Sequence, residues 1–138
     1  MEINIYTDGG SRGNPGISGY GLVIYDQDKN ILYQESKFLG LKTNNEAEYL
    51  GLLASLKWIK NNQKLYQINK ANFFSDSQLL IRQMQGKYKV KAPNLKDLFI
   101  QSLQLLTQIN LDCQFNHIRR EFNLLADKLA NQAMDHCR

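Results

Sequence analysis

Two hydrophobic periodicities follow one another along this chain, and their order constrains its fold more than any other feature. Apolar and polar residues alternate over 3–7, and β-prone runs return at 20–25 and 31–39. Glycine, asparagine and proline at 9–16 predict one turn, and the polar stretch 26–30 predicts the next. Connections this short join antiparallel strands, so the first forty residues predict a three-stranded meander.

Helical periodicity dominates the rest of the chain. We expect further strands at 71–75 and 112–118 and helices at 44–62, 77–85, 93–108 and 124–134. Strands that are joined through helices run parallel. The order βββαβααβα therefore predicts an α/β fold, with a five-stranded mixed sheet, helices packed on both faces, and one domain over 1–138.

The composition agrees with a folded domain that meets a polyanion. With 43% hydrophobic residues, the 138-residue chain can build a core without disulfides. No apolar run approaches the length of a membrane span, and the start lacks the regions of a signal peptide. Two cysteines, Cys113 and Cys137, favour a reducing, cytoplasmic setting, although a bridge between them stays open. The net charge of +4 favours nucleic acid if a group of acids is metal-bound.

Two aspartates follow β-prone runs, where an unpaired carboxylate is costly to bury. Asp8 follows 3–7 and precedes two glycines, which let another backbone approach closely, and Asp76 follows Phe73 and Phe74. Neither has an obvious cationic neighbour in sequence, so we expect them to share a divalent cation, magnesium or manganese. Asp8 could instead open a turn, and Asp76 could cap the helix that follows it.

Two neighbouring glutamates near the start of the first helix have different explanations. Thr43 and Glu46 fit a capping box, which assigns Glu46 a structural role. Glu48 is rotated from Glu46 by about 200° on the helix, so capping does not explain it. Asp127 lies early in the last helix, where an acid favours the helix dipole in any case, and Asn123 is the expected N-cap.

Four motifs occur together in this order: TDGGSRGNPGISGYG at 7–21, TNNEAEY at 43–49, SDSQ at 75–78 and ADKLAN at 126–131. With them, nearly the whole chain resembles ribonuclease H of type 1. The resemblance implies the ribonuclease H-like fold and hydrolysis of the RNA strand of RNA/DNA hybrids, leaving a 5′-phosphate and a 3′-hydroxyl. It also implies two magnesium ions, with manganese as a substitute, held by Asp8, Glu48, Asp76 and Asp127.

The same resemblance implies a set of substrate contacts. The positions that match hybrid-contacting residues of the family are Gly9, Asn14, Thr43, Asn44, Asn45 and Gln78. Turn and helix-start chemistry would also explain the asparagines. The implied partner is an RNA/DNA hybrid, with no membrane and no obligatory protein partner, and we expect a monomer.

The chain departs from many bacterial relatives before its last helix. Its segment 116–123 has no glycine and is similar to an archaeal and bacterial subgroup that lacks the basic handle, so we do not expect His117 to be catalytic. Arg120 and Glu121 are predicted auxiliary residues. Lys87, Lys89 and Lys91 are expected to replace part of the handle, although a solvated edge would also explain them.

Three other interpretations stay open. A catalytically inactive hybrid- or RNA-binding module would need none of the four acids. A nuclease domain of a polymerase or reverse transcriptase would share the motifs, although the start at Met1 favours a stand-alone enzyme. A transposase or integrase core shares the fold but usually carries three acids and lacks the TNN-x-x-E pattern.

Overall fold

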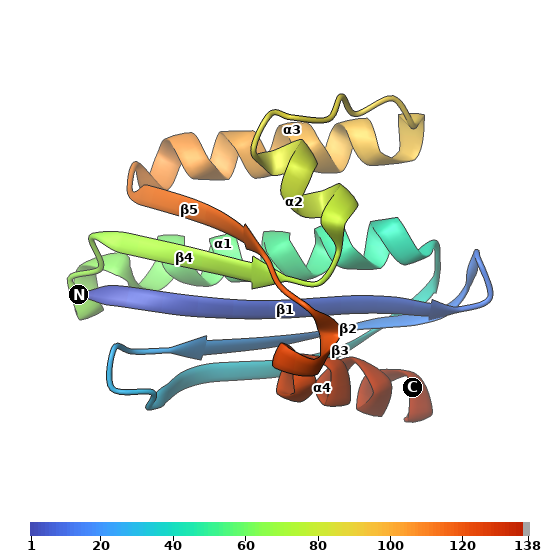
Figure 1. Ribbon diagram of the computed structural model, residues 1–138, viewed down its shortest axis with the longest axis horizontal. Helices are drawn as coiled ribbons and strands as arrows, with labels where there is room; N and C mark the ends of the chain where they lie inside the picture. Colours follow the sequence, from blue (N-terminus) through green and yellow to red (C-terminus); the bar gives the residue numbers. More distant parts are fainter. Residues whose placement is uncertain (137–138) are drawn as a thin grey trace.

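Five strands form one mixed sheet in the computed structural model, which describes residues 1–136 (Figure 1). The strands are β1 (Glu2–Arg12), β2 (Gly16–Tyr25), β3 (Ile31–Lys42), β4 (Lys70–Ser75) and β5 (Asp112–His117). Their order across the sheet is β3-β2-β1-β4-β5. The first three strands pair antiparallel, whereas β4 pairs parallel with both β1 and β5. The predicted meander and parallel strands are therefore confirmed.

Helices cover both faces of this sheet, as the pattern predicted. They are α1 (Asn44–Tyr66), α2 (Gln78–Met84), α3 (Pro93–Ile109) and α4 (Leu124–Asp135), with a 3-10 turn, η1 (Arg120–Phe122). Figure 1 shows α1 behind the sheet and α4 in front of it, over β2 and its neighbours. α3 packs against α1. Within residues 1–136, no helix is both long and apolar enough to cross a membrane.

The core lies between α1 and the face of the sheet that the odd-numbered residues of β1 form. Ile3 and Ile5 are fully buried there, as the alternation over 3–7 predicted. Apolar residues of β2 and α1 complete the layer: Leu22, Ile24, Leu52, Leu56 and Ile59. Asn4, Tyr6 and Asp8 therefore point to the opposite face, which α4 covers only in part.

Several boundaries differ from the prediction, including the start of β2 at Gly16 rather than 20 and the end of β3 at Lys42 rather than 39. The expected turn at 9–16 is only three residues long, because Gly9 and Gly10 stay extended and pair with Tyr20 and Gly19 of β2. Asp8 therefore lies inside β1 rather than at its end. α1 runs four residues past the expected stop at Asn62, whose side chain donates to the Trp58 carbonyl inside the helix. The helix ends because its C-cap residue, Gln67, adopts the left-handed conformation with φ of 53°.

A glycine on β2 sets the distance between the sheet and α4. A Cβ atom on Gly21 would lie 2.0 Å from the backbone oxygen of Ala126 and 2.8 Å from the nitrogen of Ala130. Backbone atoms of a packed helix cannot move aside locally, so any side chain here must displace α4 as a whole.

We therefore expect Gly21→Ala to lower the free energy of unfolding by about 3 kcal/mol, the upper range for overpacking. Gly10→Ala is the matched control on β1, because its Cβ would meet only side chains, the flexible end of Met134 at 3.3 Å and Asn44 Oδ1 at 3.9 Å. Urea unfolding of both variants measures the difference. Equal losses would show that α4 does not depend on this close approach.

Candidate metal centre

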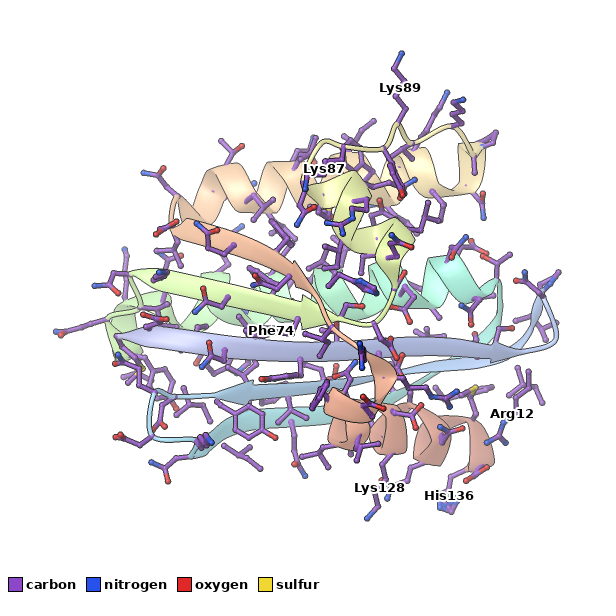
Figure 2. The ribbon with its side chains drawn as sticks, viewed as in Figure 1. Arg12, Phe74, Lys87, Lys89, Lys128 and His136 are labelled. Carbon is purple, nitrogen blue, oxygen red and sulfur yellow. The ribbon has the colours of Figure 1, made fainter. Side chains whose placement is uncertain are left out.

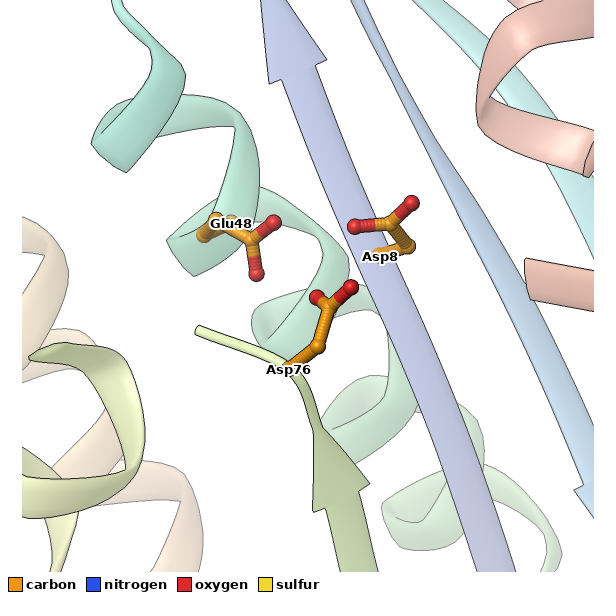
Figure 3. A group of neighbouring side chains, drawn as sticks. All are labelled: Asp8, Glu48 and Asp76. Atoms are coloured by element: carbon orange, nitrogen blue, oxygen red, sulfur yellow. The ribbon is translucent and has the colours of Figure 1, made fainter. Parts of the chain in front are cut away.

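Three of the four predicted acids meet where the parallel pairing of β1 and β4 ends. The last pair in that register is Tyr6 with Phe74, so Asp8 on β1 and Asp76 just after β4 each lie two residues beyond it. Glu48 reaches the same point from the second turn of α1. One carboxylate oxygen from each of the three lies within 4.8 Å of the others (Figure 3). The three acids thus come from three segments that are far apart in sequence: β1, α1 and the connection between β4 and α2.

Gly9 allows α1 to bring Glu48 this close. A Cβ atom on Gly9 would lie 2.5 Å from the backbone of Ala47 and Glu48, so the helix fills the space that a side chain would need. The Gly9 N–H donates to Glu48 Oε1 at 2.7 Å, and Ser75 Oγ donates to the other oxygen at 3.3 Å. The close backbone approach expected at this glycine is thus made by the chain's own helix. Whether Gly9 also contacts substrate stays a prediction.

Helix capping leaves Glu48 and Asp76 available as ligands. Thr43 and Glu46 form the predicted capping box, with bonds of 3.2 and 2.9 Å, and the bond from the Thr43 N–H lowers the pKa of Glu46. α2 is capped by Ser77, whose oxygen accepts from the Leu80 N–H. Asp76, which could have capped this helix, does not serve this purpose. Ser75 supports Glu48.

The three carboxylates are costly when no cation is bound. Burial raises the pKa of Asp8 first, and the nearby charges of Glu48 and Asp76 raise it further. Burial also raises the pKa of Glu48, although the Gly9 N–H partly offsets this. A hard divalent cation would remove the repulsion, because carboxylate oxygens are the ligands that magnesium and manganese prefer. The donor set therefore fits such a cation.

Asp127 faces the same cavity and helps to raise the pKa of Asp8, although the three converging oxygens belong to Asp8, Glu48 and Asp76. The cavity measures about 340 Å³, and its wall includes Asp8, Glu48, Asp76, Asp127 and Arg120. Asp127 accepts from Arg120 Nη2 and from Asn131 Nδ2, both at 3.3 Å. An ion pair with Arg120 neutralises part of its charge. Its role as the fourth ligand stays a prediction.

The predicted substrate residues differ in how they lie relative to this cavity, which we call the acidic cavity. Gly9 and Asn44 belong to its wall among the described residues, whereas Thr43, Asn45, Gln78 and Asn14 do not. The side chain of Asn14, from the turn between β1 and β2, accepts from the Asn44 N–H at 3.0 Å. This contact joins the turn to the start of α1. Four of the six predicted positions therefore lie in two segments that contact each other, the end of β1 with its turn and the start of α1: Gly9, Asn14, Thr43 and Asn44.

The predicted auxiliary residues lie at three different places. Arg120 lines the acidic cavity, but Glu121 points to solvent and pairs with Arg119 at 3.6 Å. His117 ends β5 and is exposed, and its expected lack of a catalytic role stays a prediction. The segment Lys87–Lys91 connects α2 to α3, and Figure 2 shows Lys87 and Lys89 projecting from it. Cys113 lies on β5, and its suggested partner Cys137 lies outside the described residues.

Asn123 has a role that the sequence prediction missed. It holds the N-cap position of α4 but makes no cap bond among residues 1–136; instead its Nδ2 donates to the Thr7 carbonyl at 2.8 Å. The residue is 2% exposed, so this bond anchors the start of α4 beside Asp8. No neighbouring residue signalled this burial, because Phe122 and Leu124 on either side of Asn123 are themselves exposed.

Comparisons with known proteins agree with this geometry. A family model described as "Reverse transcriptase-like" matches residues 6–133. Ribonuclease H of Ruthia magnifica subsp. Calyptogena magnifica is 32% identical, over 97% of this chain and 96% of that protein. The chain belongs to the ribonuclease H family. LC11-RNase H1, solved in complex with an RNA/DNA hybrid, is a ribonuclease H with a TM-score of 0.91 to this chain, 42% identity and 96% coverage of both chains.

A second relative shows that this ribonuclease H unit also occurs within longer proteins. Bifunctional protein Rv2228c of Mycobacterium tuberculosis is 41% identical over 136 residues, which cover 98% of this chain. The chain spans only 36% of the length of that relative. The shared part therefore defines the family and the fold.

The raised pKa of Asp8 predicts how pH changes the stability of the cation-free protein. As pH rises above the ordinary value of 3.8, the unfolded chain loses this proton while the folded chain keeps it, so stability falls. Asp8→Asn cannot ionise, so in EDTA we expect it to be more stable than the parent by about 2 kcal/mol at pH 8. The gap should close toward pH 4, and denaturant titrations at several pH values measure it.

The exposed Asp97 on α3 provides the control, since Asp97→Asn removes a carboxylate far from the centre. Saturating magnesium should stabilise the parent and the control more than Asp8→Asn. Equal stability of the parent and Asp8→Asn at pH 8 would show that the three carboxylates do not destabilise the cation-free protein.

Proposed function

We propose that this chain hydrolyses the RNA strand of RNA/DNA hybrids in a reaction that needs divalent cations. The observation that carries the proposal is the triad of Asp8, Glu48 and Asp76, whose oxygens converge within 4.8 Å in a cavity open to solvent. Membership of the ribonuclease H family and the likeness to LC11-RNase H1, solved with a hybrid, support the choice of substrate.

In this proposal, Asp8, Glu48, Asp76 and Asp127 hold two magnesium ions, for which manganese can substitute. When bound, such a pair supplies an ionised water and stabilises the leaving oxygen, giving a 5′-phosphate and a 3′-hydroxyl. The protein's own groups orient the ligands: the Gly9 N–H and Ser75 Oγ hold Glu48, and Asn123 holds the helix that carries Asp127. Arg120 places a positive charge at the cavity for a phosphate oxygen.

Substrate selection in this proposal falls to the polar groups around the cavity. Asn14, Asn44, Asn45 and Gln78, with the backbone at Gly9, would contact the 2′-hydroxyl side of the hybrid, and Thr43 a phosphate of the DNA strand. Lys87, Lys89 and Lys91 would meet phosphates farther along the duplex. A monomeric state and a cytoplasmic location also stay predictions.

A cleavage assay tests the proposal against its alternative, an inactive hybrid-binding module. The purified chain is given labelled RNA/DNA, RNA/RNA and DNA/DNA duplexes, with magnesium and with EDTA. We expect the RNA strand of the hybrid to be cut only with magnesium. Tight hybrid binding without cleavage, in magnesium and in manganese, would favour the binding module instead.

The neighbouring glutamates provide a matched pair of variants for this assay. Glu48→Gln should lower kcat by at least about a hundredfold, because a charged ligand of the centre is lost. Glu46→Gln should keep activity within a few-fold, since glutamine also completes a capping box. A larger loss of kcat in Glu46→Gln than in Glu48→Gln would show that the metal ligand is Glu46, on the other side of α1.

The segment Lys87–Lys91 generates a prediction about salt. Replacing Lys87, Lys89 and Lys91 by Ala should raise KM for the hybrid by about tenfold and flatten its dependence on salt, because fewer counterions are released. The kcat should change little. The exposed lysines of α1, replaced together by Ala, are the control: Lys57, Lys60 and Lys64. If the KM of the variant equals that of the parent at low and at high salt, the three lysines do not contact the hybrid and are only solvated.

A further inference from the structure

The face of the sheet that carries Asp8 also carries a group of aromatic side chains. Tyr6 and Phe74 lie two residues before Asp8 and Asp76 on the same strands, and their rings stack with centroids 4.8 Å apart. Tyr25 of β2 meets Tyr6 edge-on at 5.6 Å. Figure 2 labels Phe74 on this face, to one side of α4. α4 covers the half of this face where β1 and β2 carry their glycines. Among residues 1–136, the helices leave open the half that holds the aromatic rings.

A second cavity, of about 330 Å³, lies beside these rings, and we call it the aromatic cavity. Tyr6, Tyr25 and Asn4 form its floor, and Phe122 and Leu124 form part of its rim. The rim residues are 67% and 64% exposed, which is unusual for large apolar side chains. The complete lining is Asn4, Tyr6, Tyr25, Lys29, Phe122, Asn123, Leu124, Leu125 and Ala126.

The lining of the aromatic cavity favours a negatively charged occupant. Lys29 contributes a cation, and no acidic side chain belongs to the wall within the described part of the chain. The first turn of α4 forms another part of the wall. Because the Asn123 side chain bonds to Thr7 instead of capping, the N–H groups of this turn keep the partial positive charge of a helix start. The buried Oδ1 of Asn123 has no partner among residues 1–136.

The aromatic cavity and the acidic cavity adjoin each other along two elements. On β1, Tyr6 lines the first and Asp8 the second, about 7 Å apart at the usual rise of a strand. On α4, Ala126 lines the first and Asp127 the second. The aromatic rings therefore lie within reach of a strand that places a phosphate at the acids.

We propose that the aromatic cavity binds one unpaired nucleotide of a strand whose paired part lies at the acidic cavity, so that hybrids with a single-stranded extension are preferred. This inference rests on the proposed function. The base would stack on Tyr6, Tyr25 or Phe122, and its phosphate would meet Lys29 and the start of α4. An unpaired base enters without the cost of opening a base pair.

An apolar peptide side chain is the competing occupant, and three features disfavour it. A peptide has no need of Lys29, of an uncapped helix start or of a position that adjoins the acids. Stacking on aromatic rings is tolerant of base identity, so we expect a preference for unpaired structure rather than for sequence.

Matched hybrids test the preference. One blunt hybrid is compared with four others that carry a four-nucleotide extension at the RNA 5′, RNA 3′, DNA 5′ or DNA 3′ end. We expect at least one extension to lower KM by about tenfold, as stacking of one base predicts. Phe122→Ala should reduce this ratio to below about two, and Lys29→Gln should also reduce it. A ratio near one for all four extensions in the parent protein would overturn the inference.

Leu65 offers the matched control, because it is an apolar residue 78% exposed near the far end of α1. Leu65→Ala should keep the full preference for the extended hybrid. Loss of the preference in this control as well would show that any exposed apolar residue serves, and would overturn the assignment to the aromatic cavity.

A second measurement does not depend on cleavage. An extension that carries 5-iodouridine next to the junction is irradiated with the protein in EDTA, and the linked peptide is identified by mass spectrometry. Linkage to Tyr6, Tyr25 or Phe122 supports the inference, whereas linkage only to Trp58 or to the Lys87–Lys91 segment overturns it. If no hybrid is cut but these adducts form, the proposed function fails and the nucleotide site stands.

Discussion

The bond from the Gly9 N–H to Glu48 is the interaction on which the rest of the site depends. It is buried, it joins residues 39 positions apart, and it exists only because α1 reaches the β1 backbone where no Cβ stands. A larger residue at Gly9 would push the helix start outward. Glu48 would then leave Asp8 and Asp76, and Asn44 would leave the wall of the acidic cavity.

This arrangement concentrates negative charge in a place where the fold alone gains nothing from it. Burial and mutual repulsion raise the pKa values of Asp8 and Glu48. The two arginines in the cavity wall pair with other acids, Arg120 with Asp127 and Arg12 with Asp135. The close approach of the carboxylates lowers stability locally, and a shared divalent cation would remove this repulsion. The well-packed layer between α1 and the sheet supplies the stability that makes this arrangement tolerable.

The other face of the sheet depends on how α4 is seated. Gly21 lets the helix approach β2, and Asn123 ties its first residue to the Thr7 carbonyl, which lies beyond the last β1–β4 pair. These two contacts place Asp127 toward the acids and leave the aromatic half of the sheet open. One helix position thus shapes both cavities, which explains why they adjoin.

Local patterns were enough to predict much of this protein. Alternation and helical spacing predicted the element order and the mixed sheet, and the Thr43–Glu46 capping box was predictable because both of its partners lie within one helical turn. The motifs predicted the family and the acids that the fold brings together. The role of Glu48 could be separated from that of Glu46 because the two side chains point in different directions on one helix.

Contacts between distant segments decided the rest. β1 continues to Arg12 because β2 supplies backbone partners for its glycines, and no local signal distinguishes that from a turn. Ser77 rather than Asp76 caps α2, since the Asp76 carboxylate turns toward the acids of other elements. Asn123 bonds to a carbonyl 116 residues away. The sequence determined which residues are present in each element, and only the tertiary structure determined which of them meet, because the partners are set by packing and not by spacing along the chain.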